Sequence, residues 1–213
     1  MKTKLPLLLL LFFGITSNAQ VVIENYPGSS ASIFQATNFI NMNGKMYYFA
    51  RTSGYQWSLY ATDGSASGNQ VVKNLGVQVA NIMPQTDFDY AFNDFKAVYN
   101  GKLYFVASGQ LWQSDGTIAG TISLSSNLDP KFFKFFNNKL YFTAYSAAAN
   151  RELWSTDGTL AGTTLVKDIY VGATYPSFDS SRNPHFTVFN NKLWFVANDG
   201  INGYELWSSD GTT

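Results

Sequence analysis

The chain has 213 residues, a formal net charge of zero at pH 7 and no cysteine. The balanced charge and the lack of a basic cluster exclude an electrostatic binder of nucleic acid or of a membrane surface. The missing cysteines exclude disulfides, thiolate metal sites and a lipid-modified cysteine. Charged residues make up 13% and aromatic residues 17% of the chain, a balance that favours a β-rich fold. We expect no cofactor.

The N-terminus has the pattern of an export signal. Two lysines precede an apolar run from Leu5 to Ile15, and the small residues Ser17 and Ala19 fit cleavage before Gln20. The run is shorter than the roughly 20 residues that a spanning helix needs. We therefore expect a signal peptide over residues 1–19, no membrane span in the mature chain, and a secreted or outer-cell-surface location.

The mature chain, 20–213, is predicted to be one repeat domain. It begins with a strand at Val21–Tyr26, because "VVIENYPGSSASIF" aligns with "LVKDIYVGATYPSF", which follows a later repeat. This segment therefore has the pattern of a fourth strand without its three predecessors. Four units follow, over about residues 36–75, 95–127, 131–170 and 185–213.

Each unit contains two anchors. The first is a two-residue Asn-Gly or Asn-Asn step between apolar strands, as in "YNGKLYFVA" and "FNNKLYFTA", and such steps favour type I′ hairpin turns. The second is the phrase "RELWSTDGTLAGTT" and its copies, which recur about every 50 residues. Its repeated positions are Asp63, Asp115, Asp157 and Asp210 and, before them, Trp112, Trp154 and Trp207. A residue that recurs at one hairpin of every unit is interpreted as structural.

The third unit predicts four strands, at Lys131–Asn137, Lys139–Ser146, Arg151–Asp157 and Thr163–Tyr170. The second and third strands are apolar on both faces and should be buried between neighbouring units. A four-stranded meander with this period is typical of a β-propeller blade. The fold class is therefore all-β, a propeller-like array of four-stranded antiparallel blades. A repetitive β-sandwich or β-solenoid is the alternative.

Between the first two units, "MPQTDFDYAFND" is the least repetitive part of the mature chain. It combines acids with aromatic residues, a composition suited to carbohydrate or protein contact, and it makes Asp87, Asp89 and Tyr90 candidate binding residues. A long surface loop between blades is the structural alternative.

The phrases "ELWSTDGTLAGTTLVKDI" and "ELWSSDGTT" resemble the ELWxxDGT repeat of large exported bacterial surface proteins. The second unit has Gln110 in place of the leading glutamate, and the first is the most degenerate. The resemblance implies a propeller-like array, often with a C-terminal sorting domain, and it brings no catalytic residue. It also makes further repeats of the same protein a candidate partner.

These observations favour a non-enzymatic scaffold that binds protein or polysaccharide. The alternative is a propeller-type glycan hydrolase or lyase, which would have to use non-repeated acids such as Asp87, Asp89, Asp94 or Asp179. The acids of "NDGINGYE" do not have the spacing of a calcium-binding EF-hand loop, and we expect no metal site.

The last unit ends within "DGTT". We expect the sequence to be an N-terminal fragment of a longer protein. If Val21–Tyr26 pairs with the strand at Tyr204–Asp210, four blades close into a ring; otherwise they form an open arc.

Overall fold

The computed structural model describes residues 35–51, 56–65, 67–77, 96–172 and 175–212. The predicted signal peptide, the predicted strand at Val21–Tyr26 and the candidates Asp87, Asp89 and Tyr90 lie outside these residues. Among the described residues, no helix has the length and apolar character needed to cross a membrane.

The described residues form four antiparallel sheets, so the predicted fold class is confirmed. Each sheet is built from strands that are consecutive in the chain, which is the meander that the repeats predicted. The first sheet contains β1 (Gln35–Met42), β2 (Lys45–Arg51), β3 (Gln56–Thr62) and β4 (Gln70–Val77), and the second contains β5 (Lys96–Tyr99), β6 (Lys102–Ala107), β7 (Gln110–Ser114) and β8 (Ile122–Ser123). The third contains β9 (Lys131–Phe136), β10 (Lys139–Ser146), β11 (Asn150–Thr156) and β12 (Thr164–Lys167), and the fourth contains β13 (Thr187–Phe189), β14 (Lys192–Asn198) and β15 (Tyr204–Ser209).

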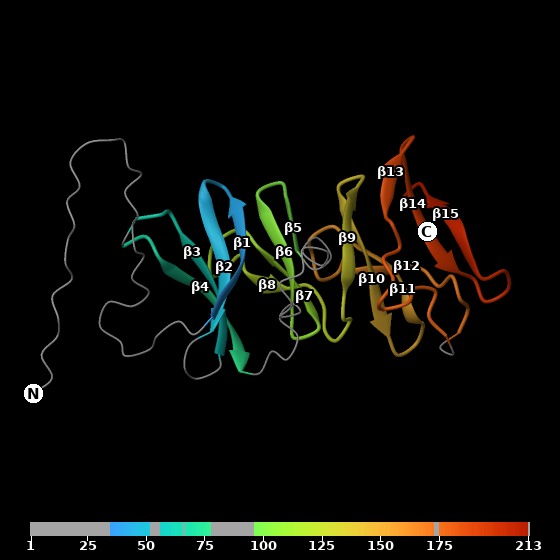
Figure 1. Ribbon diagram of the computed structural model, residues 1–213, viewed down its shortest axis with the longest axis horizontal. Coiled ribbons are helices and arrows are strands. Elements are labelled where there is room, and N and C mark those ends of the chain that lie inside the picture. Colours follow the sequence, from blue (N-terminus) through green and yellow to red (C-terminus); the bar gives the residue numbers. More distant parts are fainter. Residues whose placement is uncertain (1–34, 52–55, 66, 78–95, 173–174, 213) are drawn as a thin grey trace, which may run out of the picture.

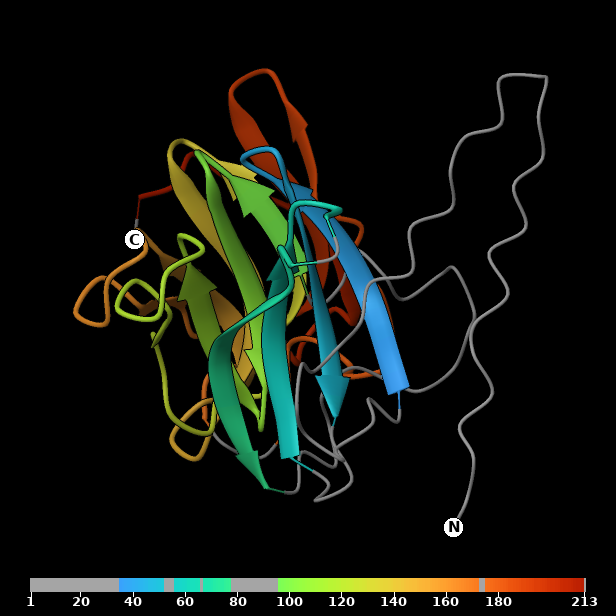
Figure 2. The same cartoon turned by 90° about the vertical axis from the view of Figure 1, so that its left-hand side faces the viewer.

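The four sheets stand in a row in the order of the sequence (Figure 1). Seen along the row, they overlap one behind another, face to face (Figure 2). The first and fourth sheets lie at opposite ends, so the described sheets form the open arc, not the closed ring. The pairing of Val21–Tyr26 with β15, which would close the ring, involves residues outside the described ones.

The turns that join the first two strands of each unit have the predicted geometry. In the third unit, Asn137 and Asn138 have φ values of 46° and 58°. The same positive φ values occur at both residues of the Asn-Gly or Asn-Asn step in every unit. A type I′ turn requires this conformation at both central positions, and asparagine and glycine adopt it at low cost.

The Asp-Gly-Thr loop is closed by the side chain of its aspartate. Asp157 Oδ1 accepts hydrogen bonds from the backbone N–H of Thr159 at 2.9 Å and from its hydroxyl at 2.7 Å. These bonds lower the pKa of the Asp157 carboxyl, the hydroxyl contributing most. A Cβ at Gly162 would lie 2.1 Å from Asp157 Oδ1, which explains the glycine five residues later. The corresponding bonds recur around Asp63, Asp115 and Asp210.

The repeated Leu-Trp pair links neighbouring sheets. Leu153 packs forward against the fourth sheet, in a cluster with Phe195 and Trp207. Trp154 lies on the opposite face of its strand and packs back against the second sheet, in a cluster with Leu111. The faces that carry Leu59, Leu111, Leu153 and Leu206 are called leucine faces below, and those that carry Tyr60, Trp112, Trp154 and Trp207 are called tryptophan faces. Each interface joins the leucine face of one sheet to the tryptophan face of the next.

A tyrosine on the leucine face of each of the first three sheets, Tyr47, Tyr104 and Tyr141, reaches the Asp-Gly-Thr loop of the next unit. A Cβ at Gly116 would lie 2.1 Å from the hydroxyl of Tyr47, and one at Gly158 would lie 2.8 Å from that of Tyr104. Burial, and then the negative charge of Asp115, raises the pKa of Tyr47. The loop glycine therefore leaves room for a side chain of the preceding unit.

Candidate functional site

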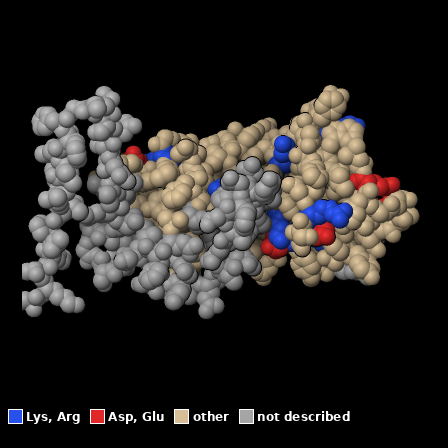
Figure 3. Space-filling model, viewed as in Figure 1, with Lys and Arg blue, Asp and Glu red and all other residues tan. Residues whose placement is uncertain are grey.

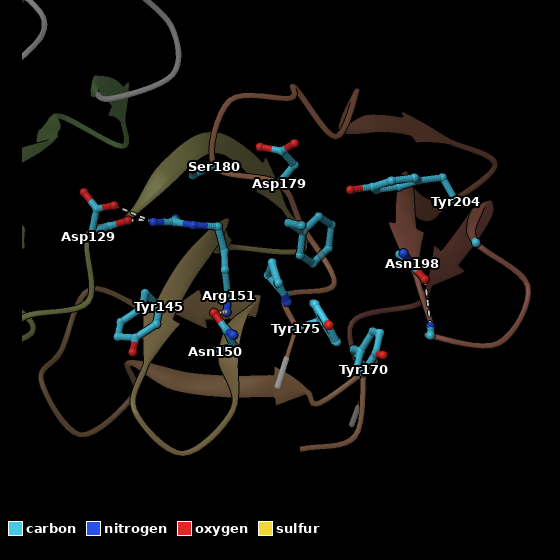
Figure 4. A pocket seen from close by; sticks show the side chains of 14 residues that line it. Asp129, Tyr145, Asn150, Arg151, Tyr170, Tyr175, Asp179, Ser180, Asn198 and Tyr204 are labelled. Atoms are coloured by element: carbon cyan, nitrogen blue, oxygen red, sulfur yellow. Dashed lines mark hydrogen bonds and ion pairs between the residues drawn. The ribbon is translucent and has the colours of Figure 1, made fainter. Parts of the chain in front are cut away.

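A cleft of about 800 Å³ opens between the third and fourth units. It lies where β10 turns into β11 and where β14 turns into β15, and the segment that links the two sheets forms part of its wall. Figure 4 shows Tyr145 and Asn150 on the third unit, Asn198 and Tyr204 on the fourth, and Tyr170, Tyr175 and Asp179 on the link. On the face shown in Figure 3, basic and acidic side chains lie close together over these two units.

Four tyrosines line the cleft and leave ring surface open to solvent. Tyr145, Tyr175 and Tyr204 are 46%, 59% and 42% exposed. The rings of Tyr170 and Tyr175 lie 5.8 Å apart at 55° to each other. The guanidinium of Arg182 lies 4.6 Å from the ring centre of Tyr204, a cation–π contact that orients this ring. A cleft walled by several exposed tyrosines offers flat apolar surfaces edged with hydroxyl groups.

The link is hydrogen-bonded to both sheets. The N–H of Phe178 donates to the carbonyl of Arg151 at 3.3 Å, and the N–H of Asn198 donates to the carbonyl of Ser177 at 3.0 Å. The aromatic rings of Phe178 and Phe195 lie 5.8 Å apart below it. These hydrogen bonds hold the link between the two sheets. They therefore fix the positions of the link side chains that line the cleft.

A buried glutamate fastens the same link from below. Glu152 has no exposed surface, and its carboxylate accepts hydrogen bonds from Ile169 N at 2.9 Å, Ser177 N at 3.1 Å and Ser177 Oγ at 2.7 Å. Burial raises the pKa of Glu152 to about 7, although the three donors act in the opposite direction. Because Ile169 and Ser177 flank Tyr170 and Tyr175, this repeated glutamate positions the aromatic wall.

An ion pair closes the floor of the cleft on the side of the third unit. Arg151 is buried, and its guanidinium binds both the carboxylate and the backbone carbonyl of Asp129, the latter at 2.9 Å. Further bonds reach Thr143 O at 3.4 Å and Thr143 Oγ1 at 3.5 Å. The charge of Arg151 is therefore neutralised within the protein, and Asp129 is held as its counter-ion.

The acids of the cleft are not arranged for glycoside hydrolysis. Such a reaction needs a carboxylic acid with a raised pKa, to protonate the leaving group, and a second carboxylate opposite it. Asp179 accepts a backbone N–H and a hydroxyl from Ser181, at 2.8 Å and 2.7 Å, and these bonds lower its pKa. Asp129 is paired with Arg151. Glu152, whose pKa is raised, is fully buried and bonded to the link.

The structure places the sequence-derived candidates as follows. Asp179 lies on the wall of the cleft, whereas Asp87, Asp89, Tyr90 and Asp94 lie outside the described residues. The repeated aspartates lie in hairpin loops and bind their own backbone, and the repeated tryptophans Trp112, Trp154 and Trp207 pack between sheets.

Asp199, one of the acids of "NDGINGYE", also has a structural role. Asp199 Oδ1 accepts the N–H groups of Ile201 and Asn202, each at 2.8 Å, and so shapes the turn between β14 and β15. His185 is exposed and has a φ of 57°. Within the described ranges, no group of three or more histidine, cysteine or acidic residues could hold a metal ion.

The cleft could not be predicted from the sequence. Its walls come from the link between two units and from two hairpins, so no single motif marks it. The usable signal was the pair Tyr170 and Tyr175, at and just after the end of the predicted third unit. By composition alone, the link that follows is distinguished only by its polarity, since the link between the first two predicted units is longer.

Comparisons with known proteins identify no family. No family model matches the chain, and no curated protein matches it. Among solved structures, a puromycin hydrolase is similar at a TM-score of 0.49 and 13% identity, over 85% of this chain and 28% of the hydrolase. A family 117 glycoside hydrolase produced by the marine bacterium Zobellia galactanivorans gives a TM-score of 0.36 at 11% identity, over 83% of this chain and 66% of that one.

An α-L-arabinofuranosidase from Clostridium thermocellum gives a TM-score of 0.31 at 15% identity, over 75% of this chain and 59% of the enzyme. The chain therefore spans little more than a quarter of the puromycin hydrolase and about three fifths to two thirds of the two glycosidases. At TM-scores below 0.5 these likenesses indicate neither a shared activity nor a shared site.

Proposed function

We propose that this chain is an exported repeat scaffold that binds a polysaccharide in the cleft between its third and fourth units and does not cleave it. The observation that carries the proposal is the set of tyrosines that border the cleft, three of them more than two fifths exposed. A sugar ring has apolar C–H faces and polar hydroxyl edges. An aromatic ring can cover the face while amides and carboxylates bind the edge.

The polar groups needed for the edge are present. Asp179 borders the cleft from the link, and Asn198 and Asn150 border it from the two hairpins. Binding is favoured over hydrolysis because Asp179 has a lowered pKa and Asp129 is committed to Arg151. The export signal and the resemblance to surface-protein repeats agree with a secreted or cell-surface location, and both remain predictions.

The test is affinity electrophoresis of the purified chain in gels that contain neutral or acidic polysaccharides. Tyr175→Ala should weaken binding about tenfold, the effect of removing one aromatic anchor. Phe189→Ala is the matched control, because Phe189 is 61% exposed but lies far from the cleft along the sheet. It ends β13 and pairs with Lys192, at the opposite end of β14 from Asn198.

Equal retardation of the wild type and both variants would contradict the cleft as the site, and so would the absence of retardation in every gel. Release of sugar fragments, abolished by Asp179→Asn, would instead establish a hydrolase or lyase.

A further inference from the structure

The outer face of the fourth sheet is apolar and uncovered. Leu206 is 69% exposed, and it pairs across the sheet with Val196. Trp194 lies on the same face, two residues before Val196, because side chains alternate along a strand. Lys192, two residues before Trp194, and Ser208, which pairs with Trp194, lie at the margin of this apolar centre. This is the leucine face of the fourth sheet, and the fourth sheet stands at the end of the row (Figure 1).

The same face is covered in every other unit. Leu59, Leu111 and Leu153 hold the place of Leu206 in their sheets, and they are 0%, 0% and 1% exposed. The covering residues are also equivalent from one interface to the next. Leu153, for example, is covered by Leu193, Phe195 and Ala197 of β14, together with Trp207.

The tryptophan face of the first sheet differs from the faces that cover the other leucines. It carries Met46, Tyr48 and Ala50 on β2 and Tyr60 on β3, where the later units have leucine, phenylalanine, alanine and tryptophan. Tyr48, Ala50 and Tyr60 are 5%, 0% and 2% exposed, whereas Phe39 and Val71 beside them are 56% and 41% exposed. A second copy of this chain would therefore offer Leu206 a face without the leucine, phenylalanine and tryptophan of the internal interfaces, which favours a separate unit as the occupant.

We propose that the leucine face of the fourth sheet is a docking surface for a further unit of the same repeat. The docked unit presents a leucine, a phenylalanine and an alanine at alternate positions of its second strand and a tryptophan on its third. Three interfaces within this chain use that pairing, so the contact continues an interface that the fold already contains. The proposal is independent of polysaccharide binding.

The alignment of the repeats shows how to build a chain with one further unit, which tests the proposal. Gly211 and Thr212 correspond to Gly158 and Thr159 in the repeated loop. A second copy of residues 161–213 placed after Thr213 therefore adds a fourth strand, the natural link and a sheet with the required tryptophan face. The probe is the fluorescence of Trp194, isolated as the difference between each protein and its Trp194→Phe variant. A second probe is the binding of an apolar dye, 8-anilinonaphthalene-1-sulfonate.

In the unextended chain, dye binding should be largely lost in Leu206→Asp and retained in Ile201→Asp, since Ile201 is 86% exposed in a loop away from this face. In the extended chain, Trp194 emission should move to shorter wavelength. The added copy exposes its own leucine face, so it is built with aspartate at the position equivalent to Leu206, and dye binding should then fall to the level of the unextended Leu206→Asp variant. Leu206→Asp at the original position should return the Trp194 emission to its value in the unextended chain.

Two outcomes would overturn the proposal. One is an extended chain whose added sheet is folded while the emission of Trp194 stays unchanged. The other is a dimer of the unextended chain that Leu206→Asp dissociates, because a second copy would then be the occupant.

Discussion

The third and fourth units carry almost the same phrase in opposite surroundings. Glu152 and Leu153 are buried, whereas Glu205 is exposed and Leu206 is 69% exposed. The strands are alike in length and in their pairing with the preceding strand, since β11 spans Asn150–Thr156 and β15 spans Tyr204–Ser209. What differs among the described residues is the fourth strand, the link and the next sheet, which only the third unit has.

This difference shows what the repeated residues are for. A single sheet forms its hairpins from local turn residues but cannot cover its own leucine face. The neighbour provides burial for the leucine, and the link provides partners for the glutamate. Stability in such a row is a sum of unit and interface contributions, so the same residue contributes differently at the end of the row.

The largest predicted effect is the difference in stability between alanine substitutions at Leu153 and at Leu206. Leu153→Ala should lower the free energy of unfolding by about 3 kcal/mol, because it leaves a cavity between two sheets. Leu206→Ala should change it by less than about 0.5 kcal/mol, as expected of an exposed position. Urea unfolding followed by fluorescence measures both. Equal losses would show that burial does not depend on the neighbouring sheet.

A second effect depends on pH and concerns Glu152. Its pKa is raised to about 7 in the folded chain, from an ordinary value of 4.5 that the unfolded chain retains. Between these values the unfolded chain loses the proton first, so the stability from Glu152 is full below pH 4.5 and is lost as the pH rises to 7. We expect a loss of about 2–3 kcal/mol, the size that a rise of this extent in the pKa implies.

The measurement is the free energy of unfolding against pH for the wild type, Glu152→Gln and Glu205→Gln. The Glu152→Gln curve should be flatter between pH 4.5 and 7, whereas Glu205→Gln should follow the wild type. The aspartates with lowered pKa act at lower pH, so they do not obscure this window. Parallel curves for all three proteins would contradict a raised pKa at Glu152.

The smallest predicted effect is the difference in stability between alanine substitutions at two loop glycines. A described unit precedes the loop of Gly116, whereas none precedes the loop of Gly64. Gly116 and Gly64 both have positive φ, at 94° and 86°, so alanine should strain either backbone by about 1–2 kcal/mol. Only at Gly116 would the new Cβ meet Tyr47, since no atom lies within 4 Å at Gly64. Gly116→Ala should therefore cost about 1 kcal/mol more. In a Tyr47→Phe background, thermal unfolding should show that this excess shrinks; an unchanged excess would place its cause elsewhere.

Local chemistry made the fold predictable, whereas the cleft depended on contacts between distant segments. Asn137 and Asn138 specify their turn by themselves, and the strands of the third unit were found to within a few residues. The largest error was at β12, which ends at Lys167 and not at Tyr170. There the chain leaves the sheet because Ile169 binds Glu152. No pattern in the sequence showed that the link would fold back onto a glutamate of the repeat and carry its tyrosines into a cleft.

The order of the strands also has a consequence for synthesis. Every sheet pairs only strands that are neighbours in the chain, so each hairpin can close soon after its residues leave the ribosome. The leucine face of a newly formed sheet stays uncovered until the next roughly 40 to 50 residues are made, as the repeat length requires. Pauses in translation between units would lengthen this exposure, and slow codons there should increase aggregation more than slow codons within a unit.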